Sequence, residues 1–180
     1  LLQKAFQYSG HNFVVLDAVD PKAVDTGLKY VNNDACYPSI LVAGQMIEAL
    51  QSGKYDLNKV ALLITQTGGG CRATNYIGFI RRALNDAGWK HIPVISLNAL
   101  GLETNPGFKF TPGLVHKAMM AAFLGDLLMR VLYRVRPYEA KPGSANALYE
   151  KWNERAEEML KSNSIFKYRK LIKGIIRDFD

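Results

Sequence analysis

The sequence predicts an α/β fold, namely an open, mostly parallel, three-layer sheet of the Rossmann-like kind with an added C-terminal helical segment. Two observations predict it. Short apolar runs typical of buried parallel strands alternate with amphipathic helical spacings over roughly the first hundred residues. Beyond that point the apolar spacing is helical only. We therefore expect an α/β domain over residues 1–110 that bears the cysteines, and a helical extension over residues 111–180 packed on it.

The strands and helices are predicted from their boundaries and their apolar periods. Apolar runs bounded by turn residues indicate buried strands at residues 13–17, 59–67 and 92–98. Helical spacings indicate helices within residues 1–10, 20–31, 39–53 and 76–88. Pro21 suits the first position of one helix, and Gly10, Gly53 and Gly88 suit the ends of the others. Further helices are expected at residues 114–133, 148–162 and 164–179. Such alternation in the first domain favours an open sheet with right-handed crossovers.

Composition and charge limit the classes of partner. The chain has 180 residues, is 48% hydrophobic and carries a net charge of +7, as a folded domain does. Its longest strongly apolar stretch, residues 118–129, contains Asp126 and is too short to cross a bilayer. Much of the surplus positive charge follows residue 129, but RNP-type, zinc-finger and helix-turn-helix patterns are missing from the sequence. We expect neither a membrane nor a nucleic acid as partner.

The cysteines and the first residues indicate the compartment and the extent of the chain. Cys36 and Cys71 are the only cysteines, too few for the disulfide framework of a small secreted protein. We therefore expect a reducing, cytoplasmic location. The sequence starts Leu1-Leu2-Gln3 with neither an initiator methionine nor a signal segment, so we expect a piece of a longer protein.

Cys71 is the first candidate site residue. It follows the predicted strand at residues 59–67 and precedes the predicted helix at 76–88. In an open α/β sheet, ligands bind at the carboxyl ends of strands, beside the amino termini of helices. The helix dipole and free N–H groups at that place stabilise a thiolate. Cys36, in the turn NNDACYP before the helix at 39–53, has a similar position. The two thiols can therefore converge in space, although each could equally be a small buried hydrophobe.

Glycines and short polar residues surround both cysteines. Gly68, Gly69 and Gly70 let the backbone approach a ligand closely and point N–H groups at it. Asn33 is a candidate for binding a cofactor beside Cys36. Neighbouring polar groups that could support a metal site are Asn32, Asp34, Thr65, Gln66 and Thr67. The alternative for all of these polar residues is ordinary turn and cap chemistry.

Two other chemistries fit the glycine run less well. The stretch GGGCRATN lacks the lysine and the spacing of a phosphate-binding loop. A nucleophilic Cys71 would need a general base, and none of the three histidines stands in a catalytic motif. A thiol enzyme is therefore the weakest of the function hypotheses.

Three segments together resemble one family. The stretches NNDACYPSILVAGQMIEAL, ALLITQTGGGCRATNYIGFIRRAL and PVISLN closely resemble the dehydratase-like region of large bacterial proteins known as activators of 2-hydroxyglutaryl-CoA dehydratase, or CoA-substrate-specific enzyme activases. The later stretches GDLLMRVLYRVRPYE and PGSANALYEKW are similar to them as well. The resemblance covers nearly the whole chain and is most specific in the two cysteine segments.

The resemblance implies an iron–sulfur protein of an anaerobic system. In the related dehydratase subunits, thiolates at strand ends hold a 4Fe–4S cluster, and an ATPase activator with an actin-like fold passes it a low-potential electron for dehydration of a 2-hydroxyacyl-CoA. Carried onto this sequence, Cys36 and Cys71 are the metal-ligand candidates. The implied partners are an actin-like ATPase region in the remainder of the same polypeptide, and an acyl-CoA. Two cysteines leave a cluster's usual four ligands incomplete, so the other ligands would come from outside this chain.

Two principal hypotheses follow. In the first, the chain is a cluster-binding, dehydratase-like domain that takes part in low-potential electron transfer. In the alternative, it is a non-catalytic interaction domain that docks the ATPase part or a dehydratase subunit through the basic amphipathic segment at residues 164–180. The sequence leaves open whether the chain itself catalyses a reaction.

Overall fold

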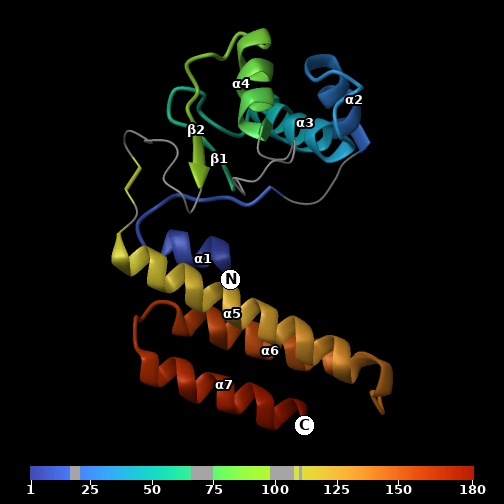
Figure 1. Cartoon of the computed structure of the whole chain (residues 1–180). Helices are drawn as coiled ribbons and strands as arrows, with labels where there is room; N and C mark the ends of the chain where they lie inside the picture. The colour runs from blue at the N-terminus through green and yellow to red at the C-terminus, as the bar shows by residue number, and fades with distance from the viewer. Residues whose placement is uncertain (17–20, 66–74, 98–107, 110) are drawn as a thin grey trace. The chain divides into compact units, whose positions relative to one another are not determined.

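The computed structural model describes residues 1–16, 21–65, 75–97, 108–109 and 111–180. Figure 1 shows its elements, which are, in chain order, α1 (Leu2–Gln7), α2 (Pro21–Tyr30), α3 (Tyr37–Gln51), β1 (Leu62–Thr65), α4 (Tyr76–Asp86), β2 (Val94–Leu97), α5 (Pro112–Val135), the 3₁₀ turn η2 (Arg136–Tyr138), α6 (Ser144–Met159) and α7 (Ile165–Phe179). They form two compact units. The first comprises Leu1–Val15 and Phe110–Asp180, and the second comprises Leu16–Lys109. We call them the helical unit and the mixed unit.

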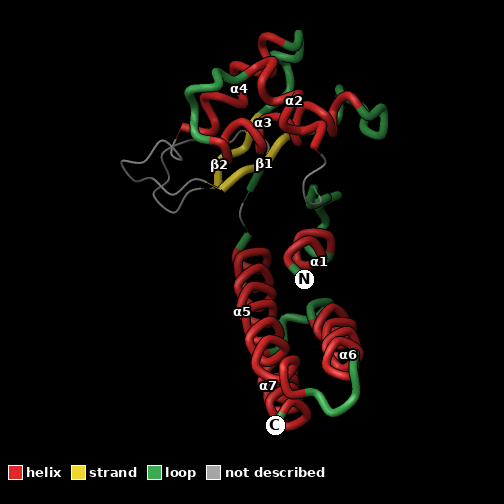
Figure 2. Tube along the Cα trace, turned by 90° about the vertical axis from the view of Figure 1, so that its right-hand side faces the viewer, coloured by secondary structure: helices red, strands yellow, loops and turns green. Residues whose placement is uncertain are grey.

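The predicted three-layer, mostly parallel sheet is wrong. The described residues are mostly helical, and their only sheet consists of two parallel strands, β1 and β2, of four residues each (Figure 2). Helices can cover both faces of a parallel sheet only where the sheet is wide enough to carry them, and this sheet is too small. Within the predicted strands at residues 59–67 and 92–98, residues 59–61 and 92–93 are not in a strand, and residues 66–67 and 98 lie outside the described residues. The elements β1, α4 and β2 form a single β–α–β unit.

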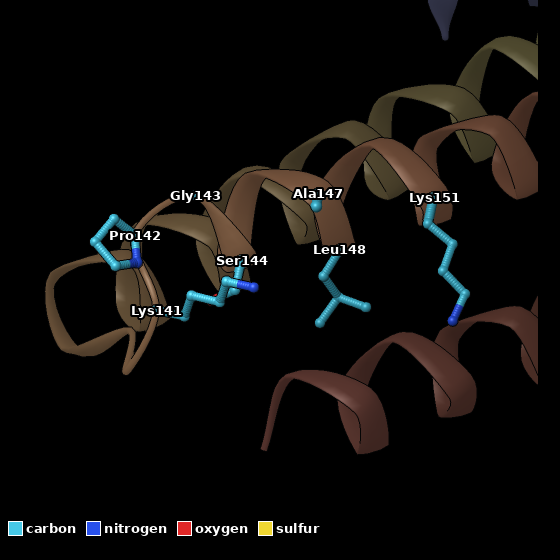
Figure 3. Close-up of a pocket in the computed structure, with 7 residues that line it drawn as sticks. All are labelled: Lys141, Pro142, Gly143, Ser144, Ala147, Leu148 and Lys151. Carbon is cyan, nitrogen blue, oxygen red and sulfur yellow. The ribbon is translucent and has the colours of Figure 1, made fainter.

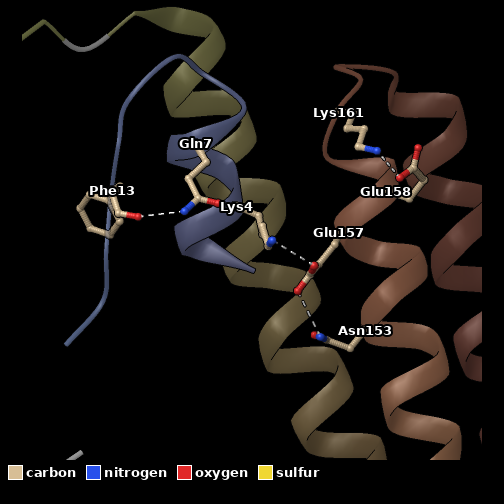
Figure 4. A network of polar contacts seen from close by, with 7 residues as sticks. All are labelled: Lys4, Gln7, Phe13, Asn153, Glu157, Glu158 and Lys161. Atoms are coloured by element: carbon tan, nitrogen blue, oxygen red, sulfur yellow. Dashed lines mark hydrogen bonds and ion pairs between the residues drawn. The ribbon is translucent and has the colours of Figure 1, made fainter. Parts of the chain in front are cut away.

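The strand predicted at residues 13–17 is absent from the described part of that range, residues 13–16. Phe13 stacks on Phe6 of α1, with ring centroids 4.4 Å apart. The Gln7 side-chain amide donates to the Phe13 carbonyl oxygen at 3.0 Å (Figure 4). Phe13 therefore packs on α1, whereas Val14, Val15 and Leu16 are exposed. The Gln7 side chain satisfies a carbonyl group that a sheet neighbour would otherwise bind.

Helices α2 and α3 pack with their backbones in contact. A Cβ atom on Gly44 would overlap the carbonyl oxygen of Ala23, and one on Gly27 would overlap the carbonyl oxygen of Ile40. Glycine in a helix interior lowers the stability of the helix by roughly 1 kcal/mol relative to alanine. The benefit of Gly27 and Gly44 is that they let the two backbones approach closely. The contact fixes the spacing of the two helices and hence the turn between them, which carries Cys36.

The core of the mixed unit joins α3, α4 and the sheet. Its buried apolar residues are Met46, Ile47 and Leu50 from α3, Leu62 from β1, Ile77, Ile80, Ala83 and Leu84 from α4, and Ile92 and Val94 at β2. A smaller cluster of Val31, Ile40 and Ala43 adjoins Ala35 and Phe79. The helical periods at residues 39–53 and 76–88 therefore predict the core faces of α3 and α4 correctly.

The core of the helical unit joins α1, α5, α6 and α7. Its buried residues include Ala5 of α1, Leu124 and Leu128 of α5, Trp152 of α6 and Ile175 of α7. The Lys117 ammonium is almost fully buried and donates to the Tyr8 carbonyl oxygen at 2.9 Å. Polar contacts at the edge of this unit include the ion pair Lys4–Glu157 at 3.7 Å (Figure 4). The first residues of the chain therefore belong with its last helices.

Helix α5 is long enough to span a bilayer, at 24 residues, but Lys117, Asp126 and Arg130 lie along it. Among the residues that the structure describes, no helix combines the length and the apolarity needed to cross a membrane.

We predict that Gly44→Ala lowers the free energy of unfolding by about 3 kcal/mol, the upper end of the 1–3 kcal/mol that overpacking typically costs, because the new Cβ atom would meet backbone that cannot rotate away. Urea denaturation followed by circular dichroism measures it. Gly78→Ala is the matched control, because the atoms near that position belong to the Asn75 side chain, which can rotate away. A loss of stability in the control equal to that of Gly44→Ala would contradict the close contact of α2 and α3.

Candidate functional site

The turn between α2 and α3 carries Cys36. Asn32, Asn33 and Asp34 lie exposed in it. The Asn32 side-chain oxygen accepts from the Asp34 N–H at 3.0 Å, and the Ala35 N–H donates to the Asn32 carbonyl oxygen at 2.9 Å. The Asn32 side chain thus performs the turn chemistry that is the alternative to a metal-supporting role, and Asp34 takes part through its backbone N–H. The role of Asn33 as a cofactor-binding residue stays a prediction.

Cys36 is the N-cap residue of α3, with extended backbone angles of φ −61° and ψ 137°. It is a free, half-buried thiol. The Ser39 hydroxyl, one helical turn on, donates to the Cys36 carbonyl oxygen at 2.7 Å and is itself buried. The predicted position of Cys36 at the amino terminus of a helix is confirmed, but the element before it is the helix α2 and not a strand.

Tyr76, the first residue of α4, lies against Cys36. Its hydroxyl oxygen is 3.6 Å from the Cys36 sulfur, and either atom can be the donor. Phe79, one turn further along α4, packs on the cluster that includes Ala35. The start of α4 therefore lies against the cysteine turn, which brings two segments 40 residues apart in the sequence together.

The surroundings of Cys36 favour its thiolate form. The Ser39 hydroxyl contributes most, followed by the Tyr76 hydroxyl and the Ser39 backbone N–H, and together they hold the pKa of the Cys36 thiol below its ordinary value. Partial burial works in the opposite direction and is outweighed. A thiolate is the form of cysteine that binds metals and attacks electrophiles.

The other half of the predicted site lies outside the described residues. This applies to Gly68, Gly69, Gly70 and Cys71, and to Gln66 and Thr67. Thr65 ends β1 and is exposed. In the sequence, Cys71 comes six residues after Thr65 and five residues before Tyr76. Among the described residues that contact Cys36, the one nearest to Cys71 in the sequence is thus Tyr76, the first residue of α4.

The described residues contain one thiol, that of Cys36, which could serve as a metal ligand. In residues 1–16, 21–65, 75–97, 108–109 and 111–180, no group of three or more histidine, cysteine, aspartate or glutamate side chains is placed to hold a metal ion. Cys36 fits a metal ligand by its chemistry, because it is partly accessible and favours the thiolate. Further ligands would have to come from Cys71 and from outside this chain.

Two residues of this site, Ser39 and Tyr76, were not predicted from the sequence. Ser39 had a detectable signal, since a serine three residues after an N-cap cysteine lies on the same helix end. Tyr76 had no such sequence signal, because its approach to Cys36 depends on how α4 packs on α3.

A groove at the start of α6 is the other candidate site. Its volume is about 540 Å³, and its lining residues are Lys141, Pro142, Gly143, Ser144, Ala147, Leu148 and Lys151 (Figure 3). The amino terminus of a helix commonly binds an anion. Here the Glu139 carboxylate accepts from the Gly143 and Ala145 N–H groups at 2.8 and 2.9 Å, and these bonds lower the pKa of Glu139. The chain's own carboxylate therefore fills this anion site.

Comparison with known proteins adds no relative, since no protein-family model, curated protein or solved structure matches the chain. The resemblance in the cysteine segments stays a prediction.

We predict that Cys36 reacts with iodoacetamide at a lower pH than an ordinary cysteine, whose pKa is about 8.5. Alkylation of a Cys71→Ser variant, followed by mass spectrometry over a pH series, measures the midpoint. Ser39→Ala and Tyr76→Phe each raise it, with the larger rise for Ser39→Ala. Because the pKa is lower in the folded state, the thiolate stabilises the fold above the unfolded-state pKa, and this stabilisation is lost as the pH falls through the folded-state value.

Tyr37→Phe is the matched control for that series, since it removes a hydroxyl from the exposed residue next to Cys36 and should leave the midpoint unchanged. If the midpoint pH for alkylation of Cys36 were the same in the folded protein and in denaturant, the assignment of a thiolate-favouring site would be overturned.

Proposed function

We propose that this chain binds an iron–sulfur cluster through the thiolates of Cys36 and Cys71, as the dehydratase-like part of a cytoplasmic activator of 2-hydroxyacyl-CoA dehydratase. The single observation that supports it is the contact of the Cys36 sulfur with Tyr76, at 3.6 Å. Tyr76 follows the glycine and Cys71 segment by only a few residues. The contact ties the turn of one cysteine to the helix that begins after the other.

The chemistry of Cys36 supports a role as a ligand. Iron–sulfur clusters are held by thiolates, and the hydroxyls of Ser39 and Tyr76 favour the thiolate at Cys36. The bound cluster would supply single-electron transfer at low potential. Hydrogen bonds to ligand sulfurs are among the factors that set the potential of such a centre. The role of Tyr76 would then be to tune that potential, without being a ligand itself.

The number of cysteines determines how many cluster ligands a partner must supply. Two cysteines supply at most half of the four ligands that a cluster usually takes. The remaining ligands would come from the rest of the polypeptide, from a second subunit or from a non-protein group. An actin-like ATPase region of the same polypeptide would supply the electron, and a 2-hydroxyacyl-CoA would be the substrate of the assembled system.

The test is anaerobic reconstitution, with iron and sulfide, of the longer polypeptide that is expected to contain this chain and the remaining ligands. We predict bound iron, acid-labile sulfide and sulfur-to-iron absorbance in the visible range, all lost in Cys36→Ser and in Cys71→Ser. Tyr76→Phe retains the iron but shifts the reduction potential, which a structural role alone would not do. Unchanged circular dichroism of the serine variants shows that they still fold. Iron content that is zero in the longer parent polypeptide, or equal in the parent and the serine variants, would sink the proposal.

A second candidate function is an interaction domain, and the exposed face of α7 favours it. The apolar residues Leu171, Ile172, Ile175 and Phe179 pack in the helical unit. The cations Lys167, Arg169, Lys170, Lys173 and Arg177 are all exposed. Among the described residues, Arg177 pairs with Asp178 at 2.9 Å, whereas the other four cations of α7 have no carboxylate within 4 Å. Such a face suits an acidic surface of the ATPase region or of a dehydratase subunit.

For this candidate, we predict that Arg169→Glu combined with Lys173→Glu weakens binding to the separately expressed ATPase region about tenfold or more, because close charge pairs at an interface are worth at least about 1.5 kcal/mol. Isothermal titration calorimetry at two salt concentrations measures it. The control is Lys54→Glu combined with Lys90→Glu, which makes the same change of net charge on the mixed unit. Deleting α7 is unsuitable because Ile175 and Phe179 lie in the core. Equal affinity in both double variants would rule the candidate out.

A further inference from the structure

The solvent-exposed face of α5 is apolar along most of its length. Five large apolar residues lie on it, Val115, Met119, Phe123, Met129 and Tyr133, and Phe123 and Tyr133 are each 61% exposed. The opposite face of the same helix carries the core residues. The exposed ion pair of Asp126 and Arg130 interrupts this apolar strip near its middle. Monomeric proteins rarely expose large apolar patches, and where one occurs it commonly marks an interface.

The shape of this face is a ridge beside a groove. Val115, Met119 and Phe123 follow one another at a spacing of four residues and form the ridge. Ala118 and Ala122 lie three residues on from Val115 and Met119, so they form a parallel row of small side chains beside the ridge. Gly125 widens that row, because a Cβ atom at this position would meet nothing within 4 Å.

Gly125 has no packing role within the described part of the chain. It lies in the middle of a helix, where glycine is less favourable than alanine. Gly27 and Gly44 leave room for a neighbouring backbone, and Gly174 leaves room for the Trp152 ring, whereas the space at Gly125 is open. An approaching helix would use that space.

We propose that the α5 face is a homodimer interface, in which the ridge of Val115, Met119 and Phe123 on each copy packs into the row of Ala118, Ala122 and Gly125 on the other. The surface is self-complementary, since one face carries both the ridge and the groove, as a two-fold symmetric interface requires. Ridges of this spacing pack into one another in the commonest class of helix pair.

The charges on this face favour a second copy of the chain over an acidic or basic partner. Asp126 and Arg130 form an ion pair at 3.1 Å within one copy, so the middle of the strip carries no net charge, and exposed Arg134 adds one positive charge at its end. The whole chain carries +7, and two copies repel each other least where the local net charge is closest to zero. From Val115 to Tyr133 the strip is about 27 Å long. A contact of one helix pair is small for a stable interface, which places the expected dissociation constant in the micromolar range.

Sedimentation velocity of the chain over a range of micromolar concentrations tests the proposal. The parent chain should pass from the mass of one copy to that of two. Phe123→Glu should raise the dissociation constant about tenfold or more, as loss of an interface anchor does. Phe166→Glu is the matched control, since Phe166 is equally apolar and 78% exposed on α7, and it should leave the dissociation constant unchanged.

Gly125→Leu distinguishes a specific, closely packed interface from non-specific apolar association. Leucine fills the groove, so we expect weaker association, whereas non-specific apolar association would become stronger. Thermal melting shows whether each variant folds. A parent chain that stays monomeric at all concentrations overturns the proposal and leaves the strip to another part of the polypeptide or to a different partner. Stronger association of Gly125→Leu, or equal effects of Phe123→Glu and Phe166→Glu, overturns it as well.

Discussion

The contact of α2 with α3 at Gly27 and Gly44 is the constraint on which the candidate site depends. With no side chain between the two backbones, the connecting turn has little freedom, and it holds Cys36 at the first turn of α3. The core formed by α3, α4 and the small sheet then sets the place of Tyr76. The thiol environment is therefore a product of helix packing, and the two-stranded sheet contributes to it only by supporting α4.

Helical periods were informative because each repeats over several turns. The helices at residues 39–53, 76–88 and 164–179 are present close to their predicted ends. The strands were harder to predict, because a short apolar run is compatible with any buried extended segment. At residues 13–17 the run includes Phe13, which stacks on Phe6, and a contact of this kind leaves no trace in local spacing. The misassigned strand led to the wrong fold class.

The candidate site was predictable only in its local part. A cysteine directly before a helical spacing indicates an N-cap thiol, and Cys36 is one. The sequence predicts that the two cysteines converge because both would lie at equivalent strand ends of one wide sheet. The described residues form no such sheet, so this reason does not apply. The contact of Cys36 with Tyr76 comes instead from the packing of α4 on α3, a relation between residues far apart in sequence that no single-sequence pattern reports.

The hydrogen bond from Lys117 to the Tyr8 carbonyl oxygen joins residues 109 positions apart and has a consequence for biosynthesis. The mixed unit, Leu16–Lys109, is inserted between the two parts of the helical unit. On the ribosome, α1 emerges before the mixed unit and cannot dock on α5 until α5 has been made. Because the entropy of closing a loop grows only slowly with its length, the insertion adds little to the cost of that late docking. The mixed unit can fold before α5 has been made, whereas the helical unit is completed only once α5, α6 and α7 have followed it.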